Sequence, residues 1–253
     1  MKAAQITEPD KPLELNQIEL SEPTGNQVLL KVISTGVCHS DLHLWEGGYD
    51  TGDGFMKVTD RGVKFPVTPG HEVVGIVEKI GESVKDVKIG DTFLVYPWIG
   101  CGECPTCKKG DTNLCETPKS LGVFQDGGYA EKVIVPDYKF LANIGELDPD
   151  SASSLACSGL TAYTAIKKAL SNSPESILIV GAGGLGLMGI QLANHMTNCQ
   201  IICADIDDQK LKTAKELGAT HVVNTKENDA SKEIMTITNE KGVDSIVDFV
   251  NAP

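Results

Sequence analysis

Residues 176–193 read S-I-L-I-V-G-A-G-G-L-G-L-M-G-I-Q-L-A, and this stretch decides the fold of the second half of the chain. Its apolar beginning predicts a buried strand over Ile177–Val180, and the residues from Leu185 to His195 predict an amphipathic helix. The turn between them contains four glycines: Gly181, Gly183, Gly184 and Gly186. The turn satisfies the pattern G-x-G-x-x-G, and its strand and helix direct backbone N–H groups and a helix N-terminus at a pyrophosphate. The stretch therefore predicts a dinucleotide-binding βαβ unit.

An acidic residue follows the glycine turn at the distance that such a unit requires. Asp205 closes the next predicted strand, in I-I-C-A-D-I-D-D, about 20 residues after Gly186. A carboxylate at this point accepts hydrogen bonds from the adenosine ribose, and its charge repels the extra phosphate of NADP. We therefore expect NAD as the cofactor. The alternative is a glycine-rich turn followed by an ordinary helix-capping aspartate.

The sequence pattern of residues 151–253 predicts alternating helices and strands. The predicted strands are Ile177–Val180, Gln200–Ala204, His221–Val223 and Ser245–Val247. The predicted helices are Ser151–Ala156, Leu160–Leu170, Leu185–His195, Asp208–Leu217 and Ala230–Asn239. This α/β pattern predicts a doubly wound parallel sheet of the Rossmann type. A complete Rossmann sheet has six strands in the order 3-2-1-4-5-6, so we expect a partial sheet and a C-terminally truncated chain.

Residues 1–150 have a different sequence pattern, in which short predicted strands are separated by Gly and Pro. The predicted strands are Lys2–Ile6, Gln27–Ser34, Val73–Ile80, Thr92–Tyr96 and Tyr129–Val135. We therefore expect a β-rich first domain over residues 1–150 and the nucleotide-binding domain over residues 151–253.

A metal lobe is predicted within the first domain, over about residues 97–118. Four cysteines fall close together in the pattern C-x2-C-x2-C-x7-C: Cys101, Cys104, Cys107 and Cys115. Four thiolates form a closed tetrahedral shell that suits a structural zinc ion and leaves no position for substrate. Two disulfides or an iron-sulfur cluster are the alternatives. The chain opens M-K-A-A-Q-I-T-E, without the pattern of a secretory signal, which favours reduced thiols.

Composition excludes several classes of function. The chain has 253 residues, a formal net charge of -13 and 41% hydrophobic residues. Such a negative charge repels nucleic acid and anionic lipid, so we expect neither as a partner. No apolar run reaches the roughly 20 residues that cross a bilayer. We expect a cytoplasmic protein that acts on a small molecule.

Five motifs together resemble the zinc-dependent medium-chain alcohol dehydrogenases. They are C-H-S-D-L-H at 38–43, G-H-E at 70–72, the four-cysteine lobe, L-A-C-S-G-L-T-A-Y at 155–163 and G-A-G-G-L-G at 181–186. The resemblance covers the whole chain and is closest to archaeal and bacterial NAD-dependent members. It implies a GroES-like catalytic domain before the Rossmann domain, and oxidation of an alcohol to an aldehyde or ketone. It also implies one catalytic and one structural zinc, and a dimer or tetramer in the full-length parent.

The resemblance also implies a second metal site. Cys38, His71 and Cys157 would hold the catalytic zinc, with Glu72 as an occasional extra ligand. Two thiolates and one imidazole leave a fourth position open for water or substrate. Asp41 would hold the distal nitrogen of His71, its alternative being an acid that simply favours a helix N-terminus. Spacing alone does not pair ligands so far apart, and an isolated Cys or His is usually structural.

The resemblance assigns further residues to proton transfer and cofactor binding. Ser40 and His43 match a proton relay from the alcohol to solvent; without the resemblance, Ser40 reads as a helix N-cap. His39 matches a residue that contacts the NAD pyrophosphate. Lys210 matches one that contacts the adenosine ribose, although a surface lysine needs no ligand to explain it.

Two apolar residues, Trp98 and Leu121, are candidates for lining the substrate cleft, with simple packing as the alternative. A second class of function also stays open: a non-catalytic zinc- and NAD-binding scaffold, or an inactive fragment of an enzyme. Such a scaffold has no need for Cys38, His71 and Cys157 together with Ser40 and His43, which favours the enzyme.

Overall fold

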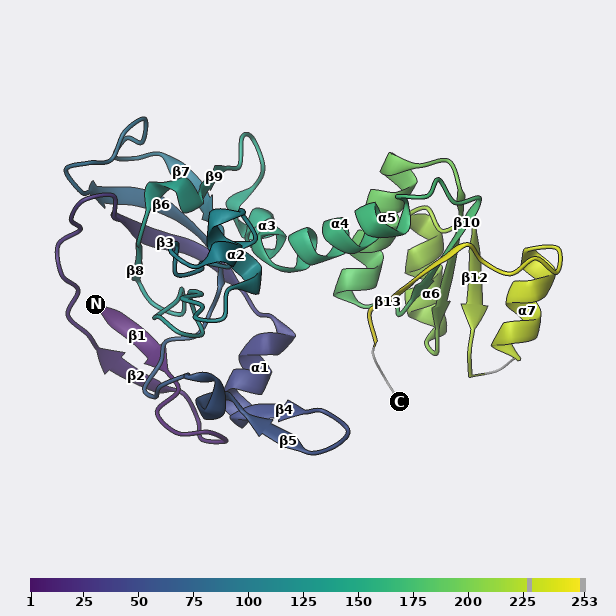
Figure 1. Cartoon of the computed structure of the whole chain (residues 1–253), viewed down its shortest axis with the longest axis horizontal. Helices are drawn as coiled ribbons and strands as arrows, with labels where there is room; N and C mark the ends of the chain where they lie inside the picture. The colour runs from purple at the N-terminus through teal and green to yellow at the C-terminus, as the bar shows by residue number, and fades with distance from the viewer. Residues whose placement is uncertain (227–228, 251–253) are drawn as a thin grey trace. The chain divides into compact units, whose positions relative to one another are not determined.

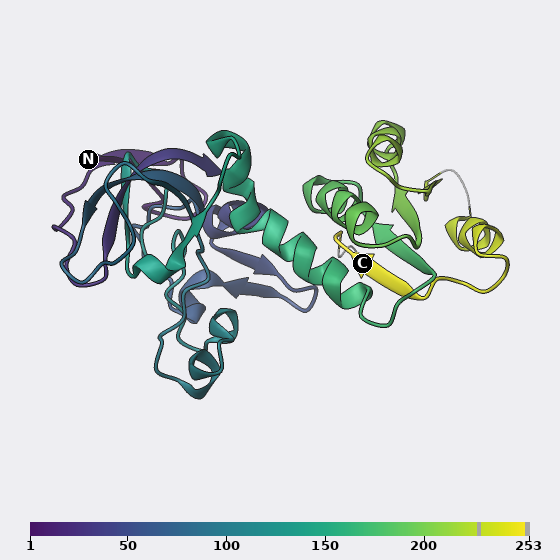
Figure 2. The same cartoon turned by 90° about the horizontal axis from the view of Figure 1, so that it is seen from above.

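The computed structural model describes residues 1–226 and 229–250. The chain divides into two compact units, Met1–Cys157 and Ser158–Pro253. Figure 1 shows the first unit in purple to teal and the second in green to yellow, and Figure 2 shows both from above.

The first unit consists mainly of β-strands. Its strands are β1 (Lys2–Gln5), β2 (Glu14–Gln17), β3 (Val28–Gly36), β4 (Gly48–Asp50), β5 (Phe55–Lys57), β6 (Glu72–Ile80), β7 (Thr92–Val95), β8 (Lys132–Val135) and β9 (Leu141–Asn143). Its helices are α1 (His39–Glu46), α2 (Pro105–Lys108) and α3 (Pro149–Ala152), with 3₁₀ turns at Val58–Arg61, Thr112–Leu114, Tyr138–Phe140 and Ser153–Ala156. Five strands form an antiparallel sheet in the order β8-β3-β6-β7-β9, and β1-β2 and β4-β5 form separate hairpins.

The five strands predicted for this unit are present, and the β-rich architecture is confirmed. Apolar side chains from β3 and β6, including Val28, Leu30, Val73 and Val77, form its main core. The last predicted strand begins later than expected, at Lys132, and the residues before it pair with β1 only through the bridge of Ala3 with Ala130. The hairpin β4–β5 was not predicted, because its Gly- and Asp-rich sequence lacks an apolar alternation.

The second unit is a four-stranded parallel sheet with helices. Its elements are α4 (Ser158–Ala169), β10 (Ser176–Val180), α5 (Gly184–Met196), β11 (Gln200–Asp205), α6 (Asp208–Glu216), β12 (His221–Asn224), α7 (Ala230–Ile237) and β13 (Ser245–Asp248). The strand order is β12-β11-β10-β13, which is the predicted 3-2-1-4 part of a Rossmann sheet. The four predicted strands agree with the observed ones to within one residue at each end.

Side chains of β10 point alternately to the two faces of this sheet, and each face has its own core. Ile177 and Ile179 pack with residues of α4, α5 and α6. Leu178 and Val180 pack with residues of α7. Because helices cover both faces, the sheet is doubly wound, as the continuous apolar sequence of its strands predicts.

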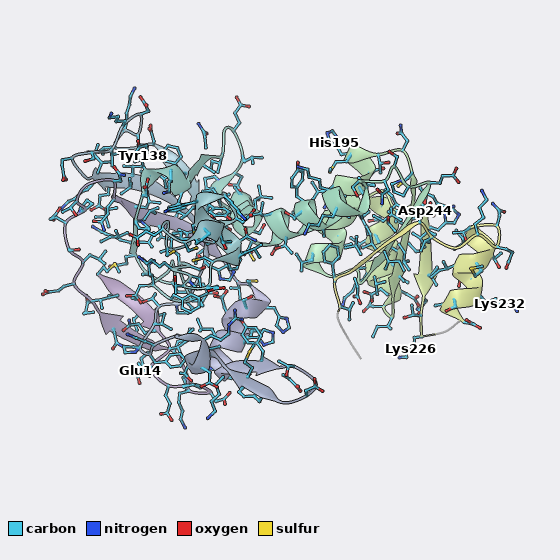
Figure 3. All side chains as sticks on the ribbon, viewed as in Figure 1. Glu14, Tyr138, His195, Lys226, Lys232 and Asp244 are labelled. Atoms are coloured by element: carbon cyan, nitrogen blue, oxygen red, sulfur yellow. The ribbon has the colours of Figure 1, made fainter. Side chains whose placement is uncertain are left out.

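The segment before β13 is tied to the start of β10 by Asp244, which Figure 3 labels. Its carboxylate accepts hydrogen bonds from the backbone N–H groups of Ser176 and Glu175, each at 2.9 Å. These bonds hold the pKa of Asp244 below its usual value. In the described part of the chain, no helix has both the length and the apolarity needed to cross a membrane.

Candidate functional site

Four potential metal ligands converge in the first unit. Cys38 follows β3 and caps α1, His71 and Glu72 stand at the start of β6, and Cys157 follows the last 3₁₀ turn of the unit. One ligand atom of each lies within 4.8 Å of those of the others. The antiparallel pairing of β3 with β6 places Gly36 opposite Glu72, and so brings the segments that carry Cys38 and His71 together.

The geometry of this group fits a zinc ion. The Cys38 and Cys157 sulfurs are 3.8 Å apart, and two ligands at about 2.3 Å in a tetrahedral zinc shell are separated by about the same distance. This separation is far longer than the roughly 2 Å of a disulfide bond. Both ring nitrogens of His71 are buried without a hydrogen-bond partner, which is costly unless another group binds them. A bound metal ion would satisfy one of these two nitrogens.

Asp41 lies directly behind His71. Its Oδ1 atom is 3.3 Å from His71 Nδ1, within ion-pair distance although outside hydrogen-bond geometry. The same carboxylate accepts hydrogen bonds from the N–H groups of Cys38 and Gly70, at 2.9 and 3.1 Å, and from the Tyr129 hydroxyl at 3.3 Å. Asp41 therefore joins α1 to the segment that carries His71, and leaves Nε2 as the histidine's free ligand atom.

The electrostatics among these side chains favour a thiolate at Cys38 beside an imidazolium at His71. A hydrogen bond from Cys157, acting against burial, lowers the pKa of Cys38 to about 4, and His71 lowers it further. Burial opposes a charge on His71, yet Asp41 and Cys38 together raise the pKa of His71 to about 10. Burial opposes the charge on Asp41 also, but His71 and two backbone N–H groups hold the pKa of Asp41 below its usual value.

Glu72 is fully buried beside this group, and its position depends on a glycine. A Cβ atom at Gly36 would lie 2.0 Å from Glu72 Oε2. Only a residue without a side chain leaves room for this carboxylate. No sequence pattern singles out Gly36, because a glycine at the end of a strand is also typical of an ordinary turn.

Helix α1 carries the other catalytic candidates. Ser40 Oγ is 3.8 Å from Cys38 Sγ, so its hydroxyl lies at the metal ligands. The His43 ring lies tilted against the rings of His39 and Tyr49, each with centroids 4.7 Å apart, and its Nδ1 atom is 3.3 Å from the Glu46 carboxylate.

The alternative interpretation of Ser40 as a helix N-cap is wrong. Cys38 is the N-cap residue, and Asp41 completes the first turn by accepting a hydrogen bond from its N–H group. The helix begins earlier than a Ser-acid pattern indicates, because this buried carboxylate caps it from the third position. The Ser40 hydroxyl is thus not needed as the cap.

A cavity of about 180 Å³ opens beside the candidate metal ligands, and Ser40 and Trp98 line it. The Trp98 ring centroid is 5.4 Å from that of His71. Leu121, by contrast, is only 1% exposed, belongs to the main core and does not line this cavity. Of the two predicted cleft residues, Trp98 therefore lies at the cavity, whereas Leu121 packs in the hydrophobic core.

The lobe that contains α2 brings its four cysteine sulfurs within 4.8 Å of one another. The sulfur–sulfur distances from Cys101 to Cys107 and from Cys104 to Cys115 are both 3.9 Å, and none of the eight cysteines forms a disulfide. Backbone N–H groups point at these sulfurs, as from Cys104 to Cys101 at 3.3 Å. Hydrogen bonds from the N–H groups of Glu103 and Cys104 lower the pKa of Cys101 to about 6. The arrangement fits a tetrahedral zinc and excludes the disulfide alternative.

The glycine turn of the second unit has the shape of a phosphate cradle. Gly181 has a φ of 93°, which only glycine adopts without strain. A Cβ at Gly186 would lie 1.7 Å from the Gly181 carbonyl oxygen, so helix and turn are in direct contact there. A Cβ at Gly183 or Gly184 would meet no atom within 4 Å. This open space beside a helix N-terminus fits a pyrophosphate.

Asp205 borders the same turn. Its Oδ2 atom accepts a 2.6 Å hydrogen bond from the Ala182 N–H group, and its Oδ1 atom accepts one from Asp207 at 3.0 Å. Its carboxylate is thereby fixed at the end of β11, where a ribose-binding acid is expected. Lys210 lies exposed in the first turn of α6, and its N–H group donates to Asp207.

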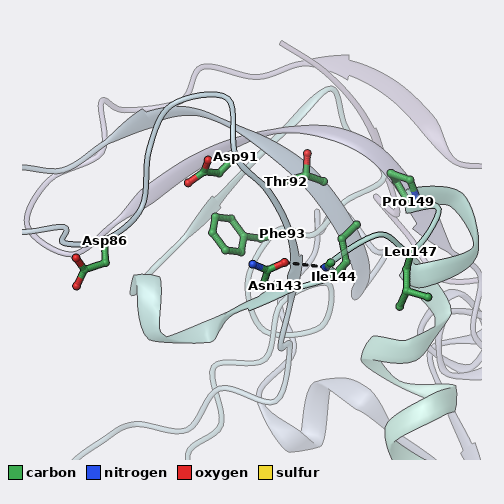
Figure 4. A pocket seen from close by; sticks show the side chains of 9 residues that line it. Asp86, Asp91, Thr92, Phe93, Asn143, Ile144, Leu147 and Pro149 are labelled. Carbon is green, nitrogen blue, oxygen red and sulfur yellow. Dashed lines mark hydrogen bonds between the residues drawn. The ribbon is translucent and has the colours of Figure 1, made fainter.

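A second hollow lies at the edge formed by β7 and β9, and it is larger, at about 460 Å³ (Figure 4). Asp86 and Asp91 stand at one end of it, and the Phe93 ring lies between them and Leu147. Neither group of potential metal ligands found among the described residues borders it. The smaller cavity is the better candidate for the functional site, because its wall includes Ser40 next to Cys38 and Trp98 next to His71.

Comparison with known proteins places these features in one family. The model "Alcohol dehydrogenase GroES-like domain" matches residues 24–146, and "Zinc-binding dehydrogenase" matches residues 184–253. An NAD-dependent alcohol dehydrogenase of Saccharolobus solfataricus is 42% identical over all of this chain, which covers 72% of that relative. The chain belongs to the zinc-dependent medium-chain alcohol dehydrogenase family.

Other members of the family support the same fold. A crystal structure of the alcohol dehydrogenase from Aeropyrum pernix matches with a TM-score of 0.87 and 33% identity, over 100% of this chain and 72% of that chain. An L-threonine 3-dehydrogenase of Pyrococcus horikoshii is 34% identical over all of this chain, which covers 70% of that relative. The GroES-like and Rossmann architecture predicted from the sequence is confirmed.

Within this dehydrogenase fold, sequence reasoning missed the residues that support the candidate ligands. Gly70 and Tyr129 hold Asp41, and Gly36 makes room for Glu72. Gly70 stands beside His71 in the G-H-E motif, which was a usable signal. Tyr129 had none, because its contact with Asp41 depends on strand pairing between distant segments.

Proposed function

We propose that this chain is an NAD-dependent zinc alcohol dehydrogenase that interconverts an alcohol with an aldehyde or ketone. The observation that carries the proposal is the convergence of Cys38, His71 and Cys157 beside a cavity. These residues would hold a zinc ion with one coordination position left for substrate, and Glu72 would be an occasional extra ligand. When bound, a zinc ion held by these residues would supply Lewis-acid stabilisation of the substrate oxygen, and a bound NAD would supply the hydride acceptor.

The chain's own residues move the proton and orient the ligands. Ser40 faces the ligand group and would accept the proton of the substrate hydroxyl, and His43, one turn further along α1, would pass it to solvent. Asp41 holds the tautomer and the orientation of His71. Trp98 gives the cavity an apolar wall that excludes water from the reacting carbon.

We assign catalysis to a first domain over residues 1–150 and cofactor binding to a second domain over residues 151–253. The glycine turn would bind the pyrophosphate, and Asp205 would bind the ribose and disfavour NADP. His39 and Lys210 would assist in binding NAD. The cysteine lobe would hold a structural zinc.

The same proposal extends to the cellular context. Eight cysteines without a disulfide are consistent with a reducing compartment, so we place the protein in the cytoplasm. A dimer or tetramer is proposed for the assembly, and size-exclusion chromatography with light scattering tests it.

A single substitution tests the catalytic assignment. We expect Cys38→Ser to lose one zinc per chain and NAD-linked oxidation of primary and secondary alcohols, while NAD binding is retained, because the glycine turn is untouched. Zinc content, steady-state turnover and NAD titration measure the three properties. Cys199→Ser is the matched control, since Cys199 belongs to neither group of potential ligands found in the described residues, and it should keep all three.

The outcomes separate the two classes of function. Full turnover in Cys38→Ser would contradict the role of Cys38. A wild-type chain that binds zinc and NAD but oxidises no alcohol of the panel would instead favour the non-catalytic scaffold.

A further inference from the structure

Arg61 is the only arginine in the sequence, in a chain whose net charge is -13. It ends the 3₁₀ turn Val58–Arg61, and Gly62 follows with a φ of 93°, which reverses the chain at this point. Arg61 lines the cavity of about 180 Å³ beside the candidate metal ligands. A positive charge at this cavity is therefore unusual for this acidic chain.

Among the described residues that line the cavity, Arg61 is the only positively charged one, and none is Asp or Glu. The apolar part of the wall includes Val63 and Phe124, and its polar part includes the Tyr49 hydroxyl and the Asn113 amide. Cys115, whose sulfur belongs to the four-cysteine group, also lines it. The guanidinium is therefore the group of this wall that can pair with an anionic ligand.

The cavity also reaches the reacting end of the proposed site. Ser40, whose Oγ atom is 3.8 Å from Cys38 Sγ, is part of its wall, as is Trp98 beside His71. One small molecule in this cavity can therefore place a hydroxyl near Ser40 and another group near Arg61. The volume corresponds to about six water molecules, which suits a ligand of a few carbons.

The guanidinium has its binding capacity available. Among the ion pairs that the described residues form, none involves Arg61. Its field is nevertheless felt inside the cavity: burial raises the pKa of Tyr49, and the charge of Arg61 opposes this increase. A guanidinium presents a planar fork of donors that matches one carboxylate through two parallel hydrogen bonds.

We propose that Arg61 selects substrates that carry a carboxylate, so that the substrate class is short hydroxy acids and the corresponding oxo acids. This inference rests on the proposed dehydrogenase function. We favour a carboxylate over a phosphate ester, because the wall offers one positive charge, which balances a monoanion but not a dianion. In the reaction, the carbinol carbon gives a hydride to NAD⁺ and its hydroxyl gives a proton to solvent. The products are a carbonyl group and NADH, and the carboxylate is unchanged.

Two matched variants test the proposal. Arg61→Gln and Lys64→Gln each remove one positive charge, but Lys64 does not line the cavity. The substrates are 3-hydroxypropanoate, 4-hydroxybutanoate and 5-hydroxypentanoate, their uncharged counterparts 1-propanol, 1-butanol and 1-pentanol, and 2-hydroxyethyl phosphate. The measured quantity is the ratio of kcat/KM for each acid to that for its uncharged counterpart. Calorimetric binding of the three acids to the wild type and to both variants provides a readout that needs no turnover.

In the wild type we expect at least one hydroxy acid to be preferred over its alcohol and over the phosphate ester. Arg61→Gln should lower the ratio by about 10-fold to 100-fold, the range of hydrogen bonds to a charged group, and weaken binding of that acid equally. Arg61→Lys should recover part of the preference, since it keeps the charge but loses the fork. Lys64→Gln should leave the ratio unchanged.

The failures of the two proposals are distinguishable. If alcohols are oxidised but the ratio is the same in Arg61→Gln and Lys64→Gln, the role of Arg61 is refuted and the dehydrogenase stands. If no substrate is oxidised, the proposed function fails, and calorimetry still decides: equal binding of the acids by both variants overturns the anion site. Preference for the phosphate ester would also overturn the assignment to carboxylates.

Discussion

At the scale of single residues, the candidate metal site depends on a carboxylate that does not itself belong to the ligand group. Asp41 is only 6% exposed, and four groups surround its two oxygens: two backbone N–H groups, the Tyr129 hydroxyl and the His71 ring. Charge on this carboxylate supports a positive or metal-bound imidazole, and its hydrogen bonds fix its orientation.

We expect Asp41→Asn to weaken zinc binding at the Cys38 site by about 10-fold to 100-fold, the usual effect of removing such a supporting carboxylate. An amide keeps the size of the side chain but loses the negative charge facing His71. Competition with a chromogenic chelator measures the affinity. Asp53→Asn, an exposed change of the same kind in the same unit, should leave it unchanged, and equal affinities in both variants would contradict this role.

At the scale of secondary-structure elements, the turn between β10 and α5 separates two functions of glycine. Gly186 allows the helix to contact the turn, whereas Gly183 faces open space. Fold stability and ligand binding therefore depend on different positions of the same motif.

Opposite effects on stability are expected from two alanine substitutions in this turn. Gly186→Ala should lower the free energy of unfolding by about 1–3 kcal/mol, because its Cβ would overlap the Gly181 carbonyl oxygen. Gly183 has a φ of -80°, so Gly183→Ala should raise it by about 0.4–1 kcal/mol by restricting the unfolded chain. Chemical denaturation measures both.

Binding should follow a different order from stability. Gly183→Ala should weaken NAD binding, because the new methyl group occupies the space of the pyrophosphate, and NAD titration measures this loss. Unchanged NAD affinity in Gly183→Ala would show that the pyrophosphate does not approach this backbone.

The same elements show how far sequence reasoning reaches. Strands β10 to β13 were predicted almost to the residue, because buried parallel strands are continuous apolar runs between helices. The alternative interpretation of Ser40 as the N-cap of α1 was wrong, because Cys38 is the N-cap and the carboxylate of Asp41 caps the helix from within. The meeting of Cys38 with Cys157 could be inferred only by resemblance, because no local pattern records a contact between segments so far apart.

At the scale of the whole molecule, the two compact units divide the chemistry unevenly. All eight potential metal ligands found in the described residues lie in Met1–Cys157, and the complete glycine turn lies in Ser158–Pro253. Each unit has its own hydrophobic core. Metal binding should therefore stabilise the first unit directly, by preferring its folded state.

We expect removal of zinc by a chelator to increase amide hydrogen exchange in the lobe around α2 and at the start of β6. The amides of β10 and β11 should keep their protection, because the core around them contains no residue of the two candidate metal-ligand groups. Exchange measured by mass spectrometry on peptides from both units tests this. Equal loss of protection in β10 would contradict independent stabilisation of the two units.

The separation of ligands along the chain has a consequence for biosynthesis. Cys104 and Cys115 are 11 residues apart, whereas Cys38 and Cys157 are 119 apart. The lobe can thus capture its ion on the ribosome as soon as a short loop closes, at little entropic cost. The Cys38 site can form only after residue 157 has been translated and β3 has paired with β6. We therefore expect metal loading during synthesis to be ordered, with the four-cysteine lobe filled before the Cys38 site.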